Sequence, residues 1–391
     1  MSRQAGQGAL PGSPGAAAVA AHDDAYARYL GRRHFGSLDG LRCLCILAVI
    51  WHHSPLMDPA SSVQLLTRGF VGVDMFFVLS GFLITTLLLR EERDSGTISL
   101  SAFYWRRALR ILPAYLLLLT AMSVYWIGVK DRHELLPLVP YYLLFLANFL
   151  REQIPLMSVT WSLSVEEQFY LLWPLTMVLL PLLAWRRILL LLGVIAVLLA
   201  FALGAGAGGL PRLQTQHAVF VLPVMSFAAL LSGALAAVLL DQRAGFRLLW
   251  AVCGHRAASA VFLALLLLWL HVSPENLKSW PGAVMCLLMA LFLVSLVMRE
   301  DNALSPLLRF APIRRIGEIS YGIYLYHLIG LHVANELVAR LLPQGNGANV
   351  LTTLIYLPIT LVMAELSFRL FERRFLMLRR RHRGGRRGPV L

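Results

Sequence analysis

The sequence predicts an all-α fold: a polytopic membrane helix bundle with about ten transmembrane helices and one re-entrant or interfacial segment. Three observations predict it. Of the 391 residues, 58% are hydrophobic and only 14% are charged, against roughly 25% charged residues in soluble domains. The mean hydropathy is +0.68. Apolar stretches near 20 residues, the length that crosses a bilayer as a helix, recur along the whole chain.

Three regions follow from the composition. Residues 1–35 are rich in Ala, Gly, Pro and Ser and are predicted to be a disordered cytoplasmic leader, because no apolar core follows a basic start as in a signal peptide. Residues 36–374 are predicted to form one transmembrane domain. Residues 375–391 are predicted to be a basic cytoplasmic tail that lies on anionic lipid.

The ten predicted spans are the long apolar stretches of the chain. An eleventh stretch, 136–150, is shorter and is interrupted by Pro137 and Pro140, so it is predicted to enter the membrane without crossing it. The spans lie at about 39–57, 69–89, 109–129, 165–184, 188–207, 218–240, 257–272, 281–298, 319–342 and 350–371.

Arginine placement decides the predicted topology. The net charge of +14 would suggest nucleic-acid binding in a soluble protein, but in a membrane protein it reflects arginines that hold cytoplasmic loops in place. With ten spans and the N-terminus inside, every arginine cluster between spans falls inside. If 136–150 crossed, every later cluster would move outside. The prediction is therefore a multi-pass membrane protein with both termini cytoplasmic and the lipid bilayer as a partner.

The first span carries ionisable residues at both ends. Arg42 and His53 are eleven residues apart, which on a helix is three turns plus roughly 20°, so they share one face about 16 Å apart along the axis. Asp39 lies three residues before Arg42 and can neighbour it. Each residue has an ordinary alternative, a snorkelling arginine or a histidine bonded to a neighbouring helix. Together they predict a polar cavity, because ionisable groups in a membrane are costly.

Three later segments carry further candidate residues. Glu166 lies near the start of the fourth span. There it is either stabilised by the helix dipole or placed beside His53 or a bound substrate. Tyr170, one turn later, shares its face. Trp161 belongs to the same motif and is a candidate for substrate binding. Asp74, in the second span, is a candidate for substrate binding, as Tyr170 is, and for orienting an arginine or histidine. Ser80 and Gly81 are better explained by helix packing.

Five motifs in order resemble the acyltransferase-3 family of bacterial integral-membrane O-acyltransferases. Together they run from about residue 36 to residue 330. The motifs are LDGLRCLCILAVIWHH, GFVGVDMFFVLSGFLI, FYWRRALRILPAYL, WSLSVEEQFYLLWP and ISYGIYLYH.

The resemblance implies the transfer of an acyl group, usually acetyl, from a cytoplasmic acyl-CoA to a hydroxyl of a saccharide or related acceptor. The family's Arg-x10-His motif falls on Arg42 and His53, and its Arg-x-x-Arg motif falls on Arg107 and Arg110. Arginines suit the phosphates of acetyl-CoA, and histidine suits a general base near neutral pH; a covalent acyl-histidine is the alternative. Asp39 and Glu166 complete the predicted catalytic set.

The fifth motif supplies two further donor-binding candidates. Tyr324 and His327 lie on one helix face, where they either form a polar wall for the donor channel or hydrogen-bond a neighbouring helix. No cysteine or histidine spacing suggests a metal site, and none is expected.

The acceptor is the least constrained part of the prediction. A cell-surface or lipid-linked saccharide is favoured because His53 lies toward the outer side. A small molecule such as a macrolide is the alternative acceptor, and a proton-coupled transporter is the alternative of another class. Polysaccharide assembly proteins are candidate partners, and nucleic acid is not expected.

Overall fold

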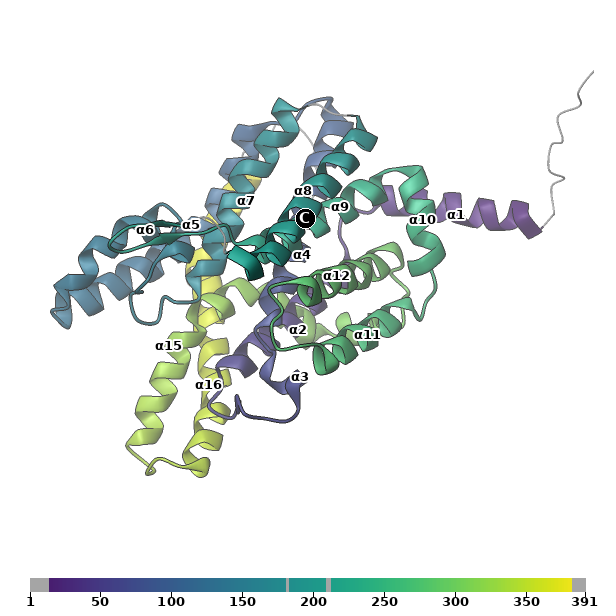
Figure 1. Cartoon of the computed structure of the whole chain (residues 1–391). Coiled ribbons are helices and arrows are strands. Elements are labelled where there is room, and N and C mark those ends of the chain that lie inside the picture. Colours follow the sequence, from purple (N-terminus) through teal and green to yellow (C-terminus); the bar gives the residue numbers. More distant parts are fainter. Residues whose placement is uncertain (1–13, 181–182, 209–211, 382–391) are drawn as a thin grey trace, which may run out of the picture.

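The computed structural model describes residues 14–180, 183–208 and 212–381, and within these ranges the protein is helical apart from one two-stranded hairpin. Figure 1 shows the helices as a bundle around α4 and α9, with α15 and α16 side by side at one edge. The predicted all-α membrane bundle is therefore confirmed.

The elements follow one another in this order: α1 (Pro14–Gly31), α2 (Gly36–His53), α3 (Gln64–Thr67), α4 (Val71–Ser95), α5 (Leu100–Ser123), the π-helix η1 (Val124–Val129), the 3₁₀ helix η2 (His133–Leu138), α6 (Val139–Leu143), the 3₁₀ helix η3 (Ala147–Phe149), α7 (Thr160–Leu179), α8 (Ala184–Gly208), β1 (Leu213–Gln214), β2 (Val219–Phe220), α9 (Val224–Asp241), α10 (Arg243–Cys253), α11 (Ala258–Val272), α12 (Trp280–Met298), α13 (Ser305–Leu308), α14 (Ala311–Glu318), α15 (Ser320–Ala339), α16 (Asn346–Ser367), the π-helix η4 (Phe368–Glu372) and α17 (Arg373–Arg381).

Six helices in the described ranges are long and apolar enough to cross a membrane, or eight if each of two bent helix pairs counts as one span. The bent pairs contain α2 and α11. The helices α7 and α15 are each 20 residues long but carry polar residues such as Glu166 and His327, and they are not among these candidates. The structure thus has a helix at each of the ten predicted ranges, although length and composition alone support six to eight spans.

The centre of the bundle is the crossing of α4 and α9. A Cβ added to Gly81 would lie 1.8 Å from the carbonyl oxygen of Leu230, and one added to Gly233 would lie 1.9 Å from that of Val78. The two backbones are therefore in direct contact, as small residues allow between membrane helices. Of the span in α4, 72% of the residues are buried, against 17% in α8, so α8 presents its apolar side chains to the surroundings.

The segment 136–150 forms only the short helices η2, α6 and η3, none longer than six residues. Each is too short to cross a bilayer. The segment nevertheless packs inside the bundle: Tyr142 is fully buried, its carbonyl oxygen accepts a 2.8 Å hydrogen bond from the Tyr115 hydroxyl, and its own hydroxyl accepts one from the Ile154 amide. Tyr115 lies eight residues beyond Arg107, so at this contact the segment is separated from Arg107 by roughly 12 Å along α5.

The contacts between loops divide the bundle into two ends. At one end Arg32 donates to the Val297 carbonyl oxygen and Arg187 pairs with Glu92. At the other end the Arg151 amide donates to the His217 carbonyl oxygen. The loops predicted to be inside meet at the first end, which agrees with a 136–150 segment that does not cross.

The predicted disordered leader is wrong for the residues that the structure describes. Residues 14–31 form α1, and its Tyr29 and Ala25 are buried. Tyr26 donates a 2.7 Å hydrogen bond to the Asp241 carbonyl oxygen, and Phe246 of α10 packs against Tyr26 and Tyr29. Residues 1–13 of the leader and residues 382–391 of the basic tail lie outside the described residues, and the first part of the tail belongs to α17.

Candidate active site

A cavity of about 1030 Å³ opens between α2, α4, α5, α7, α15 and the segment from η4 to α17. This volume is at the top of the range of roughly 300–1,000 Å³ that small-molecule sites occupy. Seven of the eleven predicted site residues line it: Asp39, Arg42, Arg107, Arg110, Glu166, Tyr170 and Tyr324. His53, His327, Asp74 and Trp161 do not.

Arginines from two helices line this cavity, and they differ in how their charge is balanced. Arg42 of α2 donates a 2.7 Å hydrogen bond to Asp39, and Arg106 of α5 pairs with Glu91 at 3.0 Å. The guanidinium of Arg107 lies over the Tyr170 ring, 4.7 Å from its centroid, and forms no direct ion pair with a carboxylate in the described part of the chain. Glu166 and Glu167 of α7 lie near enough to interact electrostatically with Arg107, so its charge is balanced at longer range rather than by a direct ion pair. Arg110, three residues further on, is on the same face of α5.

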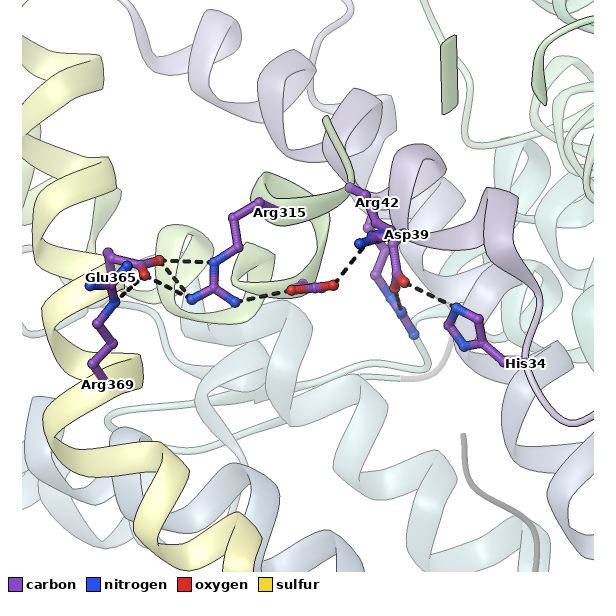
Figure 2. Close-up of polar contacts among 8 residues, drawn as sticks. His34, Asp39, Arg42, Arg315, Glu365 and Arg369 are labelled. Atoms are coloured by element: carbon purple, nitrogen blue, oxygen red, sulfur yellow. Dashed lines mark hydrogen bonds and ion pairs between the residues drawn. The ribbon is translucent and has the colours of Figure 1, made fainter. Parts of the chain in front are cut away.

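Asp39 is enclosed at the start of α2, with 9% of its side chain exposed. One carboxylate oxygen accepts from Arg42 and the other lies 3.5 Å from His34 Nε2, so Asp39 stands between these two side chains in Figure 2. A Cβ at Gly317 would lie 1.7 Å from the Asp39 carbonyl oxygen, so α14 packs directly on the backbone of α2. This packing fixes the position of the Asp39 backbone, and the hydrogen bond from Arg42 to Asp39 then orients the Arg42 guanidinium.

A second ionic cluster ties α14 to α16 beside the cavity. Arg315 donates to both carboxylate oxygens of Glu365, which also accepts from Arg369 (Figure 2). Arg315 also donates a 3.0 Å hydrogen bond to Glu318, which lines the cavity. The hydrogen bonds to Glu365 raise the pKa of the Arg315 guanidinium, so the cluster stays charged at physiological pH.

Glu166 reaches the cavity from the first turns of α7. Its carboxylate accepts a 2.7 Å hydrogen bond from the Ser80 hydroxyl of α4. Both residues line the cavity, so Ser80 joins the polar surface as well as the packing that its motif predicted. The sequence placed Ser80 six residues after Asp74 on a span, but nothing in the spacing indicated that it would meet Glu166.

Tyr324 of α15 lines the cavity and is hydrogen-bonded to the start of α7. Its hydroxyl lies 2.9 Å from the Val159 carbonyl oxygen and 2.6 Å from the Ser162 hydroxyl, both at the start of α7. The tyrosine thereby bridges α15 to the turn that begins α7. Ser162 also lines the cavity, so this hydrogen bond joins two residues of the lining.

His53 and His327 lie next to each other beyond Tyr324. Their ring centroids are 4.8 Å apart, and the Tyr324 ring is 5.6 Å from that of His327. His327 is fully buried, whereas His53 is partly exposed. The structure thus brings His327 to the predicted base rather than to the wall of the donor cavity.

Asp74 and Trp161 lie outside the cavity lining. Trp161 packs edge-on against Phe77 at a centroid distance of 6.0 Å, and Phe77 itself lines the cavity. Trp161 is therefore one layer behind the wall. Val73 rather than Asp74 lines the cavity from this part of α4. Their predicted roles in acceptor binding stay predictions.

Four acidic residues of the cavity lining were not predicted as site residues. They come from the last turns of α4, α14 and η4, where the sequence gives no periodicity that would assign them to a shared space. They are Glu91, Asp94, Glu318 and Glu372. In the described ranges, no group of three or more His, Cys, Asp or Glu residues is placed to hold a metal ion.

A cavity that is lined by several arginines and carboxylates, and that has two neighbouring histidines beside Tyr324, can bind an anionic ligand and transfer protons. Comparison with known proteins agrees with this chemistry. A family model described as "Acyltransferase domain", of the acyltransferase-3 type, matches residues 35–366.

The curated relatives point the same way. The chain is 28% identical to a "Putative O-acetyltransferase" of Staphylococcus aureus (strain COL), over 90% of this chain and 58% of the relative. It is 29% identical to a "Putative peptidoglycan O-acetyltransferase" of Bacillus subtilis, over 87% and 55%. It is 28% identical to the peptidoglycan O-acetyltransferase of Listeria monocytogenes, over 87% and 56%.

The chain therefore spans less than three-fifths of the length of each of these three relatives. No solved structure matches it.

Proposed function

This chain belongs to the acyltransferase-3 family of membrane O-acyltransferases, and on that premise we propose that it moves an acetyl group from a cytoplasmic acyl-CoA to a hydroxyl of a cell-surface or lipid-linked saccharide. The observation that carries the proposal is the single cavity shared by Arg42, Arg107, Arg110 and Glu166.

The arginines are proposed to bind the donor. Acetyl-CoA carries phosphates at one end and a thioester at the other, and guanidinium groups bind phosphate in a bidentate manner. Arg107 and Arg110 project from the first turns of α5, and Arg42 projects from α2. Arg107 supports this role best, because no described carboxylate forms a direct ion pair with it and its guanidinium faces the Tyr170 ring in the cavity lining. The long pantetheine arm then lies along the cavity toward Tyr324.

His53 is proposed as the general base. The acceptor hydroxyl attacks the thioester carbonyl carbon, its proton passes to a ring nitrogen of His53, the new C–O bond forms and the C–S bond breaks with its electron pair on sulfur. The proton then passes to the thiolate, so one thioester and one alcohol become one ester and one thiol. Because His53 does not line the cavity, this step requires the thioester to move from the cavity past Tyr324 toward His53.

Asp39 and Glu166 are proposed to position these groups. Asp39 orients Arg42 through their 2.7 Å hydrogen bond. Glu166 is held by Ser80 inside the cavity, where it accepts hydrogen bonds from a ligand hydroxyl or amide. Neither carboxylate contacts His53 in the described part of the chain.

A cell-wall saccharide is the proposed acceptor class, since the names of two relatives specify peptidoglycan. The partly exposed His53, at the far end of α2 from Arg42, supports an acceptor that arrives from the outer side. Trp161, Tyr170 and Asp74 remain the proposed acceptor-side residues. A small-molecule acceptor such as a macrolide is tested alongside. The transporter alternative has no observation in its favour.

The test is acetyl transfer by the purified full chain in lipid nanodiscs. Labelled acetyl-CoA is supplied with peptidoglycan fragments, lipid-linked saccharide or a macrolide, and ester-linked label on the acceptor is measured. His53→Ala should lower the rate by roughly 10²- to 10⁴-fold, the usual effect of losing a general base. His332→Ala, a histidine of α15 outside the cavity lining, is the matched control and should keep the rate.

Binding of acetyl-CoA without label on any acceptor would leave a donor-binding protein and refute the transferase. Full transfer by the His53 variant would refute the assigned base.

A further inference from the structure

The described residues contain a buried histidine with an unused acceptor atom, and that atom belongs to the ring beside the proposed base. His327 is fully buried on α15, and its Nε2 has no hydrogen-bond partner in the described part of the chain. Buried polar atoms nearly always have a partner, so one that lacks it calls for a specific explanation.

The hydrogen bonds of the two rings fix their tautomers. His53 Nδ1 lies 3.0 Å from the Val49 carbonyl oxygen, and His327 Nδ1 lies 2.6 Å from the Tyr324 carbonyl oxygen. A carbonyl oxygen can only accept, so each Nδ1 carries the hydrogen and donates it. In both neutral rings Nε2 is therefore the acceptor, which assigns the tautomers from their partners.

The position of His327 is fixed by its helix. Tyr324, three residues earlier, is hydrogen-bonded to Val159 and Ser162 at the start of α7, which prevents rotation of α15 about its axis. Three residues after His327, Gly330 leaves room for the Thr360 hydroxyl of α16, which would lie 2.2 Å from a Cβ at that glycine. The ring of His327 is thus held 4.8 Å from that of His53.

We propose that His327 is the positioning residue of His53: when His53 takes the proton of the acceptor hydroxyl on Nε2, the new N–H donates to His327 Nε2. The inference rests on the proposed function of His53. Protonation of His53 supplies the hydrogen-bond donor that His327 lacks, so the contact forms only as charge develops. An interaction of this kind stabilises the transition state more than the ground state.

The proton balance follows that of the transfer step. The O–H bond of the acceptor breaks and its proton goes to His53 Nε2. The histidine pair shares this proton while the acceptor oxygen bonds to the carbonyl carbon and the C–S bond breaks. The pair then gives the proton to the thiolate, which leaves as a thiol, and both rings return to their neutral tautomers.

The test uses two replacements of the same residue in the full chain. His327→Phe keeps a ring but removes the acceptor, and His327→Gln keeps an acceptor oxygen. We expect kcat to fall at least tenfold in the phenylalanine variant and to be partly restored in the glutamine variant, while the affinity for acetyl-CoA is unchanged because His327 does not line the cavity. His332→Phe, on the same helix, is the control and should keep its activity.

The pH dependence separates positioning from simple packing. An acceptor that stabilises protonated His53 is lost in His327→Phe, so the acidic limb of the kcat/KM profile should move to lower pH. Among the residues that the structure describes, the other ionisable side chains whose rings contact the pair are His52 from α2 and Tyr324 from α15.

An unchanged kcat and an unchanged pH profile in a variant that still binds acetyl-CoA would overturn the pairing while leaving the transferase intact. Equal losses in the phenylalanine and glutamine variants with an unmoved profile would also overturn it. Absence of transfer by the unsubstituted protein would instead refute the proposed function, and the pairing with it.

Discussion

Arg107 differs from its neighbours in one property that the sequence could not supply. Four arginines could be assigned to the inner end of the bundle from motif and charge, but the pairing of each depends on which carboxylate the fold brings within reach. Arg42 meets Asp39, as their three-residue spacing predicted, and Arg106 meets Glu91 from the end of α4. Arg107 meets the ring of Tyr170 on α7.

Replacement of Arg107 by alanine should weaken acetyl-CoA binding by roughly tenfold to a hundredfold, because charged hydrogen bonds contribute about 1.5–3 kcal/mol each. Equilibrium binding of labelled acetyl-CoA to the protein in nanodiscs measures it. Arg107→Lys keeps the charge but loses the planar fork, so its affinity for acetyl-CoA should lie between those of the unsubstituted protein and the alanine variant. Arg132→Ala is the control, since that side chain pairs with Glu134 in an exposed loop. Equal affinity in all variants would place the phosphates elsewhere.

The histidines show the corresponding limit of reasoning from spacing. Helical geometry placed Arg42 and His53 on one face of α2, and the resemblance assigned them to one mechanism. Spacing within one helix does not reveal which side chain of another helix stands between two residues. Tyr324 of α15 lines the cavity together with Arg42, and His327 of the same helix contacts His53. Only the packed bundle shows these two contacts.

At the scale of elements, periodicity and length predicted the helices well but not α1. The composition of residues 14–31 resembles a flexible leader, and the helix is stabilised by contacts that are distant in sequence, such as Tyr29 against Phe246. The prolines of the 136–150 segment predict that it does not continue as one long helix, and the structure has only short helices there. Its burial against Tyr115 required the structure.

The contact between α4 and α9 gives a prediction at this scale. Gly81→Ala should destabilise the protein by about 1–3 kcal/mol, as overpacking does, because the added methyl group meets the backbone of Leu230. Thermal unfolding in detergent measures the loss. Gly193→Ala on α8 is the matched control: nothing lies within 4 Å of its Cβ position, and alanine favours a helix by roughly 0.5–1 kcal/mol. Equal stability of the two variants would show that the crossing can separate without cost.

For the whole molecule, the arginine distribution and the loop contacts agree on which loops share an end of the bundle. Charge alone selects the cytoplasmic side, so the orientation follows from the positive-inside rule and not from the contacts. The native cysteines of the described residues, Cys43, Cys45, Cys253 and Cys286, are all buried, which leaves a low background for labelling.

Cysteines introduced at exposed positions should therefore report the topology. In intact spheroplasts a membrane-impermeant maleimide should label Arg132→Cys and Glu275→Cys, and Arg247→Cys should react only after permeabilisation. Arg132 precedes the 136–150 segment and the other two follow it. Labelling of Arg132→Cys and Arg247→Cys without Glu275→Cys would mean that the segment crosses, and the predicted topology would be wrong.

The continuous helix from α5 through η1 is 30 residues long, or about 45 Å at 1.5 Å per residue, whereas the hydrocarbon layer measures roughly 30 Å. The surplus must either lean or emerge among the lipid headgroups. Hydrophobic mismatch therefore falls on this one helix, and the thickness of the host bilayer sets its tilt. Arg107 lies near the start of this same helix. Lipids of different acyl length should therefore change the affinity of the proposed donor site for acyl-CoA, while the side-chain contacts inside the bundle stay the same.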